Sequence, residues 1–187
     1  MANAFIPRDR VHQMSEEIGN NVDDHQAALS RLLKDQRRIS RFFEENSEEL
    51  QAVSGSVGVY LLGVICRMFD MQGGRMRKAT WAQVREAEAH VGGLAAKILP
   101  VDEGFGERFR SVPRAQPHIL DEAYMSLFER ADDLDEEEAE LAEGEALKLL
   151  FLLWVSTEVL DANWQPGRQF AGEEEYSYVR IEPTADA

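Results

Sequence analysis

The sequence predicts an all-α protein, built as a single-domain helical bundle, on three observations. Leu, Ala, Glu, Arg and Gln, which favour helix, dominate long stretches of the 187 residues. Strand-like alternation is nearly absent, while apolar residues recur at helical spacing. With 44% hydrophobic and 29% charged residues, the chain can bury a core and should stay soluble. We expect five to seven helices within residues 1–164, followed by an irregular C-terminal tail or arm over residues 165–187.

A single apolar stripe covers residues 11–43 at intervals of three, four and seven. One helix could cover residues 8–45, or Gly19-Asn20-Asn21 could divide it into two. From residue 22 onward the spacing is a strict heptad, which is also typical of a coiled coil. His25 and Gln36 occupy seam positions and the apolar face is wide, so a globular bundle is favoured. A structural homo-oligomer built through the Val22–Phe43 part of this stripe remains an alternative.

Two segments are apolar on nearly every face, and we predict that they form the central helices. The first is Leu50–Met71, with Asn46 as the expected N-terminal cap, and the second is Glu145–Asn163. The first segment contains three glycines, Gly55, Gly58 and Gly63. Each glycine costs roughly 1 kcal/mol in a helix relative to alanine, so neighbouring helices are expected to approach closely there.

Boundary signals define the elements between these two helices. Gly73-Gly74 is expected to end the first central helix. The segment Thr80–Gln83 has the pattern of a capping box and is expected to open an amphipathic helix that ends before Pro100. Residues 100–117 are rich in Pro and Gly, which predicts an ordered but irregular loop. Pro117 is expected to start the next helix.

Charge is segregated along the chain, whose formal net charge is −15. Residues 1–50 carry 7 basic and 10 acidic side chains, and residues 51–117 carry 9 and 6. Residues 118–187 carry 4 basic and 19 acidic side chains. The imbalance therefore lies almost entirely in the last third of the chain, and the middle third is mildly basic.

The acidic segment Asp132–Glu145 has two interpretations. Its acids can be a solvated face that opens the following helix, at the positive end of the helix dipole. They can also attract a basic partner protein at long range. On the second interpretation, the predicted partner-binding residues are Glu136, Glu137, Glu138, Glu140 and Glu143. A calcium loop of the EF-hand type is not predicted, because Glu138 and Gly144 are the wrong residues at two required positions.

A short basic patch follows the first central helix and consists of Arg75, Arg77 and Lys78. Such residues could bind a phosphate, but more often they lie against the negative end of a helix dipole. Direct nucleic-acid binding is disfavoured, because a chain of net charge −15 repels phosphate at long range. The basic middle third is better suited to pairing with the acidic third of the same chain or of a second copy.

The sequence contains no catalytic signature, and no cofactor is predicted. Glu86, Glu88 and His90 cluster on one predicted helix, but no second helix carries matching ligands, so no metal site is predicted. The single cysteine, Cys66, excludes an intramolecular disulfide and is expected to be a buried small apolar residue.

These patterns favour a non-catalytic intracellular interaction module, such as an inhibitor, an immunity-type protein, an adaptor or a small assembly subunit. The expected partner is a protein with a basic surface, or a second copy of the chain. The alternative is a helical protein or enzyme that binds a small ligand or metal in a pocket between the two central helices. The aromatic residues expected in such a pocket are Tyr60, Trp81, Tyr124 and Trp154.

The predicted location is cytoplasmic, on two negative observations. The first residues contain no apolar leader segment. The longest uncharged run, Gln51–Cys66, is shorter than a bilayer-spanning helix requires, so no membrane association is expected.

Overall fold

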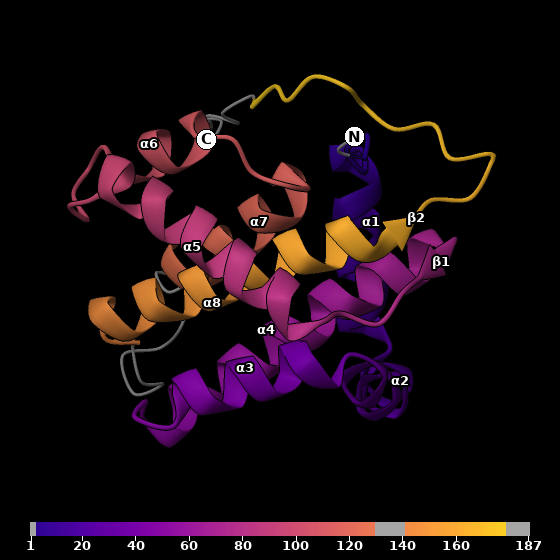
Figure 1. Ribbon diagram of the computed structural model, residues 1–187, viewed down its shortest axis with the longest axis horizontal. Coiled ribbons are helices and arrows are strands. Elements are labelled where there is room, and N and C mark those ends of the chain that lie inside the picture. The colour runs from indigo at the N-terminus through magenta and orange to yellow at the C-terminus, as the bar shows by residue number, and fades with distance from the viewer. Residues whose placement is uncertain (1–2, 130–140, 179–187) are drawn as a thin grey trace, which may run out of the picture.

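The computed structural model, which describes residues 3–129 and 141–178, is all-α, as the sequence predicts (Figure 1). Its described residues form α1 (Arg8–Asn20), α2 (Val22–Asp35), α3 (Arg37–Ser47), α4 (Ala52–Gln72), α5 (Trp81–Ile98), α6 (Phe105–Ser111), α7 (Pro117–Tyr124) and α8 (Glu143–Asn163). A π-helical turn, Met125–Glu129, continues α7. Two short strands, β1 (Arg75–Met76) and β2 (Trp164–Gln165), pair antiparallel.

The first apolar stripe forms three helices, where the sequence predicted one or two. The backbone leaves the helical conformation at Asn21 and again at Gln36. Helix α1 packs on α4 and α7, α2 packs on α4, and α3 packs on α8 and α5. His25 and Gln36, at the predicted seam, are both buried within this arrangement. The extra break and α6 account for the eight described α-helices, against the five to seven expected.

Helix α6 forms inside the segment that was predicted to be an irregular loop. Phe105 and Phe109 lie one turn apart on α6 and are at most 1% exposed. The Phe109 ring stacks on Tyr124 and meets Trp154 edge-on, with ring centroids 5.4 and 5.5 Å apart. These aromatic contacts stabilise a helix that is too short to form on its own propensity.

Three boundary predictions are confirmed. Gly73 ends α4 with a φ of 79°, a conformation that suits glycine. Thr80 and Gln83 form both hydrogen bonds of the capping box that opens α5. Pro117 occupies the first turn of α7.

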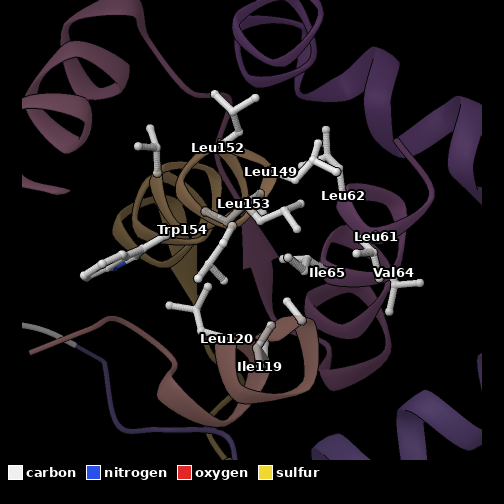
Figure 2. Packing of buried hydrophobic residues seen from close by; sticks show 14 of the residues in the cluster. Leu61, Leu62, Val64, Ile65, Ile119, Leu120, Leu149, Leu152, Leu153 and Trp154 are labelled. Carbon is white, nitrogen blue, oxygen red and sulfur yellow. The ribbon is translucent and has the colours of Figure 1, made fainter. Parts of the chain in front are cut away.

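Helices α4 and α8 form the centre of the bundle, as predicted (Figure 2). The close view shows apolar side chains of α4, α7 and α8 converging: Leu61, Leu62, Ile65, Ile119, Leu120, Leu149 and Leu153. A Cβ added at Gly58 would meet Leu149 and Phe43, and one at Gly63 would meet Leu29 of α2. The predicted close approaches at these two glycines are thus confirmed.

Helix α4 is long and apolar enough to cross a membrane, with a mean hydropathy of 1.6 over an 18-residue window. Among the described helices, it is the one with these properties. It is longer than the uncharged run in the sequence, because the helix continues through Arg67 and Asp70. However, 56% of the window is buried inside the bundle. Much of its apolar surface therefore belongs to the protein core.

Both ends of the described chain are attached to the bundle. Phe5 and Glu173 exchange two backbone hydrogen bonds, of 2.7 and 2.9 Å. The hydroxyl of Tyr176 donates to Oδ2 of Asp121 on α7 at 2.6 Å. The predicted tail is thus irregular, but its residues 165–178 are held on the helices.

Candidate functional site

One face of α4 carries large apolar side chains that remain exposed. Val53 is 53% exposed and Tyr60 is 44% exposed, and Val22 of α2 is 49% exposed. Val53 and Tyr60 lie two helical turns apart and share a face. The apolar residues of this predicted central helix are therefore not all buried, because these two remain exposed. Helix α2 crosses α4 where Leu29 meets Gly63, and Val53 and Tyr60, on the N-terminal side of this crossing, stay exposed.

A groove of about 500 Å³ lies between this half of α4 and the first two turns of α2. Its apolar lining consists of Val22, Leu29, Ala52, Gly55, Val59 and Tyr60. Nothing lies within 4 Å of the position that a Cβ on Gly55 would take, so the predicted close approach at this glycine was wrong. The backbone of α4 is instead open to the α2–α4 groove.

His25 lines the groove with two buried nitrogen atoms. The residue is 3% exposed, and its ring meets Tyr60 edge-on at 5.4 Å between centroids. Within the described residues, neither ring nitrogen has a hydrogen-bond partner. Burial, and then the charge of Arg67, lower the pKa of His25, so the neutral ring prevails at pH 7. The neutral ring has one donor and one acceptor, and both are buried beside the groove.

Glu145 in the first turn of α8 bonds to the N-terminus of α4. Its carboxylate accepts hydrogen bonds from the Ser54 hydroxyl and, at 3.0 Å, from the backbone N–H of Gln51. Both hydrogen bonds lower the pKa of Glu145, and the bond from Ser54 has the larger effect. Asn46 was predicted to cap this helix, but it lies in α3 and donates to the carbonyl of Phe42. The start of α8 therefore adjoins the N-terminus of α4.

Acidic side chains flank the α2–α4 groove. Asp23 and Asp24 occupy the first turn of α2, and both are exposed. Glu48 and Glu49 precede α4 and are also exposed. Lys148 Nζ lies 3.8 Å from Glu49, an exposed pair that contributes little net attraction. The surroundings of the groove are therefore mainly negative.

The predicted partner-binding glutamates fall largely outside the described residues. Glu136, Glu137, Glu138 and Glu140 lie in the segment that the structure does not describe. Glu143 is the first residue of α8. Two residues later, Glu145 is bonded to Gln51 and to the buried Ser54 at the start of α4. Sequence reasoning found the charge but missed the exposed apolar face of α4.

The three predicted basic residues are all exposed, and each has different neighbours. Arg77 donates from its backbone N–H to Asn163 and from Nη2 to Ala162, at 3.0 and 3.3 Å. It thus lies at the negative end of a helix dipole, although the helix is α8 rather than the preceding α4. Arg75 is exposed on β1, and Lys78 lines a different pocket.

The residues considered for a ligand or metal pocket are dispersed. Glu86, Glu88 and His90 are exposed on α5. No group of three potential metal-binding side chains occurs in residues 3–129 and 141–178. Trp154 is fully buried, Tyr124 stacks with Phe109, and Tyr60 lines the groove.

A pocket does lie between α4 and α8, but other residues form it. Its volume is about 340 Å³, and Cys66, Phe69, Leu160 and Trp164 are in its wall. Cys66 is 4% exposed, as expected for a small apolar residue, and burial raises the pKa of its thiol to about 12.

Compared with protein-family models, with curated proteins and with solved structures, the chain shows no match. The structure itself offers two candidate binding surfaces. One is the α2–α4 groove, with exposed apolar side chains, a buried unpaired histidine and acidic surroundings. The other is the pocket beside Cys66.

Proposed function

We propose that the protein is a non-catalytic interaction module that binds a basic, amphipathic helix of a partner protein in the α2–α4 groove. The observation that carries this proposal is the exposure of Val53 and Tyr60 beside an apolar groove. Contiguous apolar side chains at the surface mark sites of protein association. A groove between two helices suits a third helix whose apolar residues recur every three or four positions.

The charge around the groove supports a basic partner. Asp23 and Asp24 lie in the first turn of α2, and Glu48 and Glu49 precede α4, so the helices that form the groove both carry acids at their N-terminal ends. These charges raise the rate of association with a positive surface, and they disfavour acidic competitors. An inhibitor, an immunity-type protein, an adaptor or a small assembly subunit would each use such a surface. A cytoplasmic location is part of the same proposal.

A synthetic 18-residue helix of Leu and Lys, with Leu on one face, tests the groove in full-length protein. The double variant Val53→Ser, Tyr60→Ser should weaken its binding about tenfold, because burial of these side chains is lost. Leu99→Ser is the matched control, since Leu99 is 42% exposed elsewhere. Fluorescence anisotropy of the labelled helix measures its affinity for the double variant and for the control. Equal affinity for wild type and double variant would refute the groove as the binding surface.

A second arm tests the acidic contribution. Replacement of Glu136, Glu137, Glu138, Glu140 and Glu143 by Gln should slow association and weaken its dependence on salt. A helix of Leu and Glu should bind far more weakly than the Leu and Lys helix. Unchanged capture of the basic helix by the quintuple variant would remove the acidic segment from the proposal.

Two other occupants of the same face are distinguished by further measurements. A homodimer would appear in sedimentation as a mass that rises with concentration and falls in the Tyr60→Ser variant. A lipid surface would appear as binding to neutral phosphatidylcholine vesicles that the same variant abolishes. Either result, together with no binding of the basic helix, would overturn the proposal.

A further inference from the structure

The pocket beside Cys66 is built from five elements, and its inner wall is apolar. Its apolar lining consists of Leu32, Cys66, Phe69, Met76, Leu160 and Trp164. The Phe69 and Trp164 rings meet edge-on, with centroids 5.4 Å apart. A volume of about 340 Å³ is near the lower end for small-molecule sites, so the pocket suits a small, partly apolar molecule.

The rim of the pocket carries two acids and two bases, and half of them are already paired. Asp70 Oδ2 accepts from Arg31 at 3.0 Å and from Arg67 at 2.6 Å, so Arg31 is engaged. Asp35 and Lys78 line the same pocket. Among the residues that the structure describes, neither has an ion pair or a side-chain hydrogen bond, with each other or with a neighbour. One negative and one positive group thus remain available at the mouth.

Gln36 holds the backbone at the two available residues in place. Its side-chain Nε2 donates to the carbonyl of Arg77 at 2.9 Å, and its Oε1 accepts from the N–H of Ala79 at 3.1 Å. These bonds bracket Lys78, while Asp35 directly precedes Gln36 in the chain. The Trp164 indole N–H also donates to the carbonyl of Gly73 at 2.8 Å, which holds the opposite wall. A pocket held in this way needs little ordering to bind a ligand.

We propose that this pocket binds a free apolar α-amino acid. The apolar side chain would lie against Phe69 and Trp164, the ammonium group would pair with Asp35, and the carboxylate would pair with Lys78. A ligand of zero net charge that carries both signs is complementary to this rim, because one rim group of each sign is unpaired. This site is separate from the α2–α4 groove, so it stands or falls independently of the proposed interaction function.

Calorimetric titration of full-length protein with L-phenylalanine tests the proposal. We expect saturable one-to-one binding with a dissociation constant below about 1 mM. Two analogues each lack one charge, namely phenethylamine without the carboxylate and 3-phenylpropanoate without the ammonium group. Each should bind about tenfold more weakly than the amino acid. No saturable binding of L-phenylalanine up to about 10 mM, or equal binding of either analogue, would overturn the proposal.

Two variants assign the charges. Lys78→Met should weaken L-phenylalanine binding about tenfold and leave phenethylamine binding unchanged. Asp35→Asn should weaken L-phenylalanine similarly and leave 3-phenylpropanoate unchanged. Lys34→Met and Asp23→Asn are matched controls, since both residues are exposed on α2 and do not line the pocket. If the controls weaken binding as much as the rim variants, the site lies elsewhere.

The single cysteine provides a second readout inside the pocket. Bound L-phenylalanine should slow alkylation of Cys66 by iodoacetamide, and the protection should disappear in Lys78→Met. The comparison is made at one pH, because the thiolate is the form that reacts and its fraction changes with pH. Saturable binding without any protection of Cys66 would place the amino acid outside this pocket.

Discussion

Glu145 accepts a hydrogen bond at 3.0 Å from the backbone N–H of Gln51, a residue 94 positions earlier in the chain. The N-terminus of one central helix is therefore capped by the first turn of the other. Helix caps usually come from the residue before the helix. Here the cap also fixes how α4 and α8 meet.

Glu145→Ala should lower the melting temperature at pH 7, because the N–H of Gln51 and the hydroxyl of Ser54 lose their acceptor. The pKa of Glu145 is lowered in the folded protein, so its stabilising effect is present above the ordinary glutamate range. It is lost as the pH falls through the lowered pKa. Thermal unfolding at several pH values should show the variant and wild type converging in acid. Glu48→Ala is the exposed control, and convergence at high pH instead would contradict this account.

Gly58→Ala and Gly55→Ala should have opposite effects, although both residues lie in α4. A Cβ at Gly58 meets buried Leu149 and Phe43, so the variant should lose about 1–3 kcal/mol of unfolding free energy. Gly55 faces open space, and alanine there should add up to about 1 kcal/mol through helix propensity. Urea unfolding measures both. Equal effects would mean that α4 and α8 do not approach closely at Gly58.

Asp161→Asn should raise the melting temperature at pH 7. Asp161 is buried, and desolvation raises its pKa, while a hydrogen bond of 2.7 Å from Gln116 only partly compensates. For a group with a raised pKa, the stabilising protonated form is lost as the pH rises through the folded value. Asparagine keeps an acceptor for Gln116 without the charge. The advantage should shrink in acid, and a lower melting temperature at pH 7 would contradict the prediction.

Tyr176→Phe should loosen the segment that follows β2. It removes the hydroxyl that donates to Asp121 at 2.6 Å, a bond to a charged group that contributes about 1–2 kcal/mol. Tyr178→Phe is the control, because its ring stays over Arg110, 3.9 Å from the guanidinium carbon. Limited proteolysis should cleave Tyr176→Phe faster near residue 170 than the control. Equal cleavage would show that the ring alone holds the segment.

The sequence predicted best what depends on local pattern. The sequence predicted the apolar runs of α4 and α8, the capping box at Thr80, the end of α4 at Gly73 and the start of α7 at Pro117. Each of these features is determined by residues that are neighbours in the chain. The division at Gln36 was not, because its side chain bonds to backbone 41 and 43 residues away. Tertiary contacts of this kind leave no periodic signal.

The candidate sites were only partly predictable for the same reason. Composition shows that α4 is apolar, but the exposure of Val53 and Tyr60 depends on where α2 crosses the helix. A pocket between the central helices was anticipated, yet its wall includes Trp164 and Met76, which the pairing of β1 and β2 brings together. The acidic charge was found directly, because charge can be counted without knowing the fold.

The bridge between Phe5 and Glu173 has a consequence for engineering the chain. Arg8 also lies over the ring of Tyr178, at 5.7 Å, so the two ends of the described chain run together on one side of the molecule. A short flexible linker could therefore join residue 178 to residue 3, and new termini could be opened at Pro100–Gly104, between α5 and α6. Such a circular permutant would keep α4 and α8 intact. Two fluorophores attached at residues 3 and 178 would for the same reason be close enough for energy transfer.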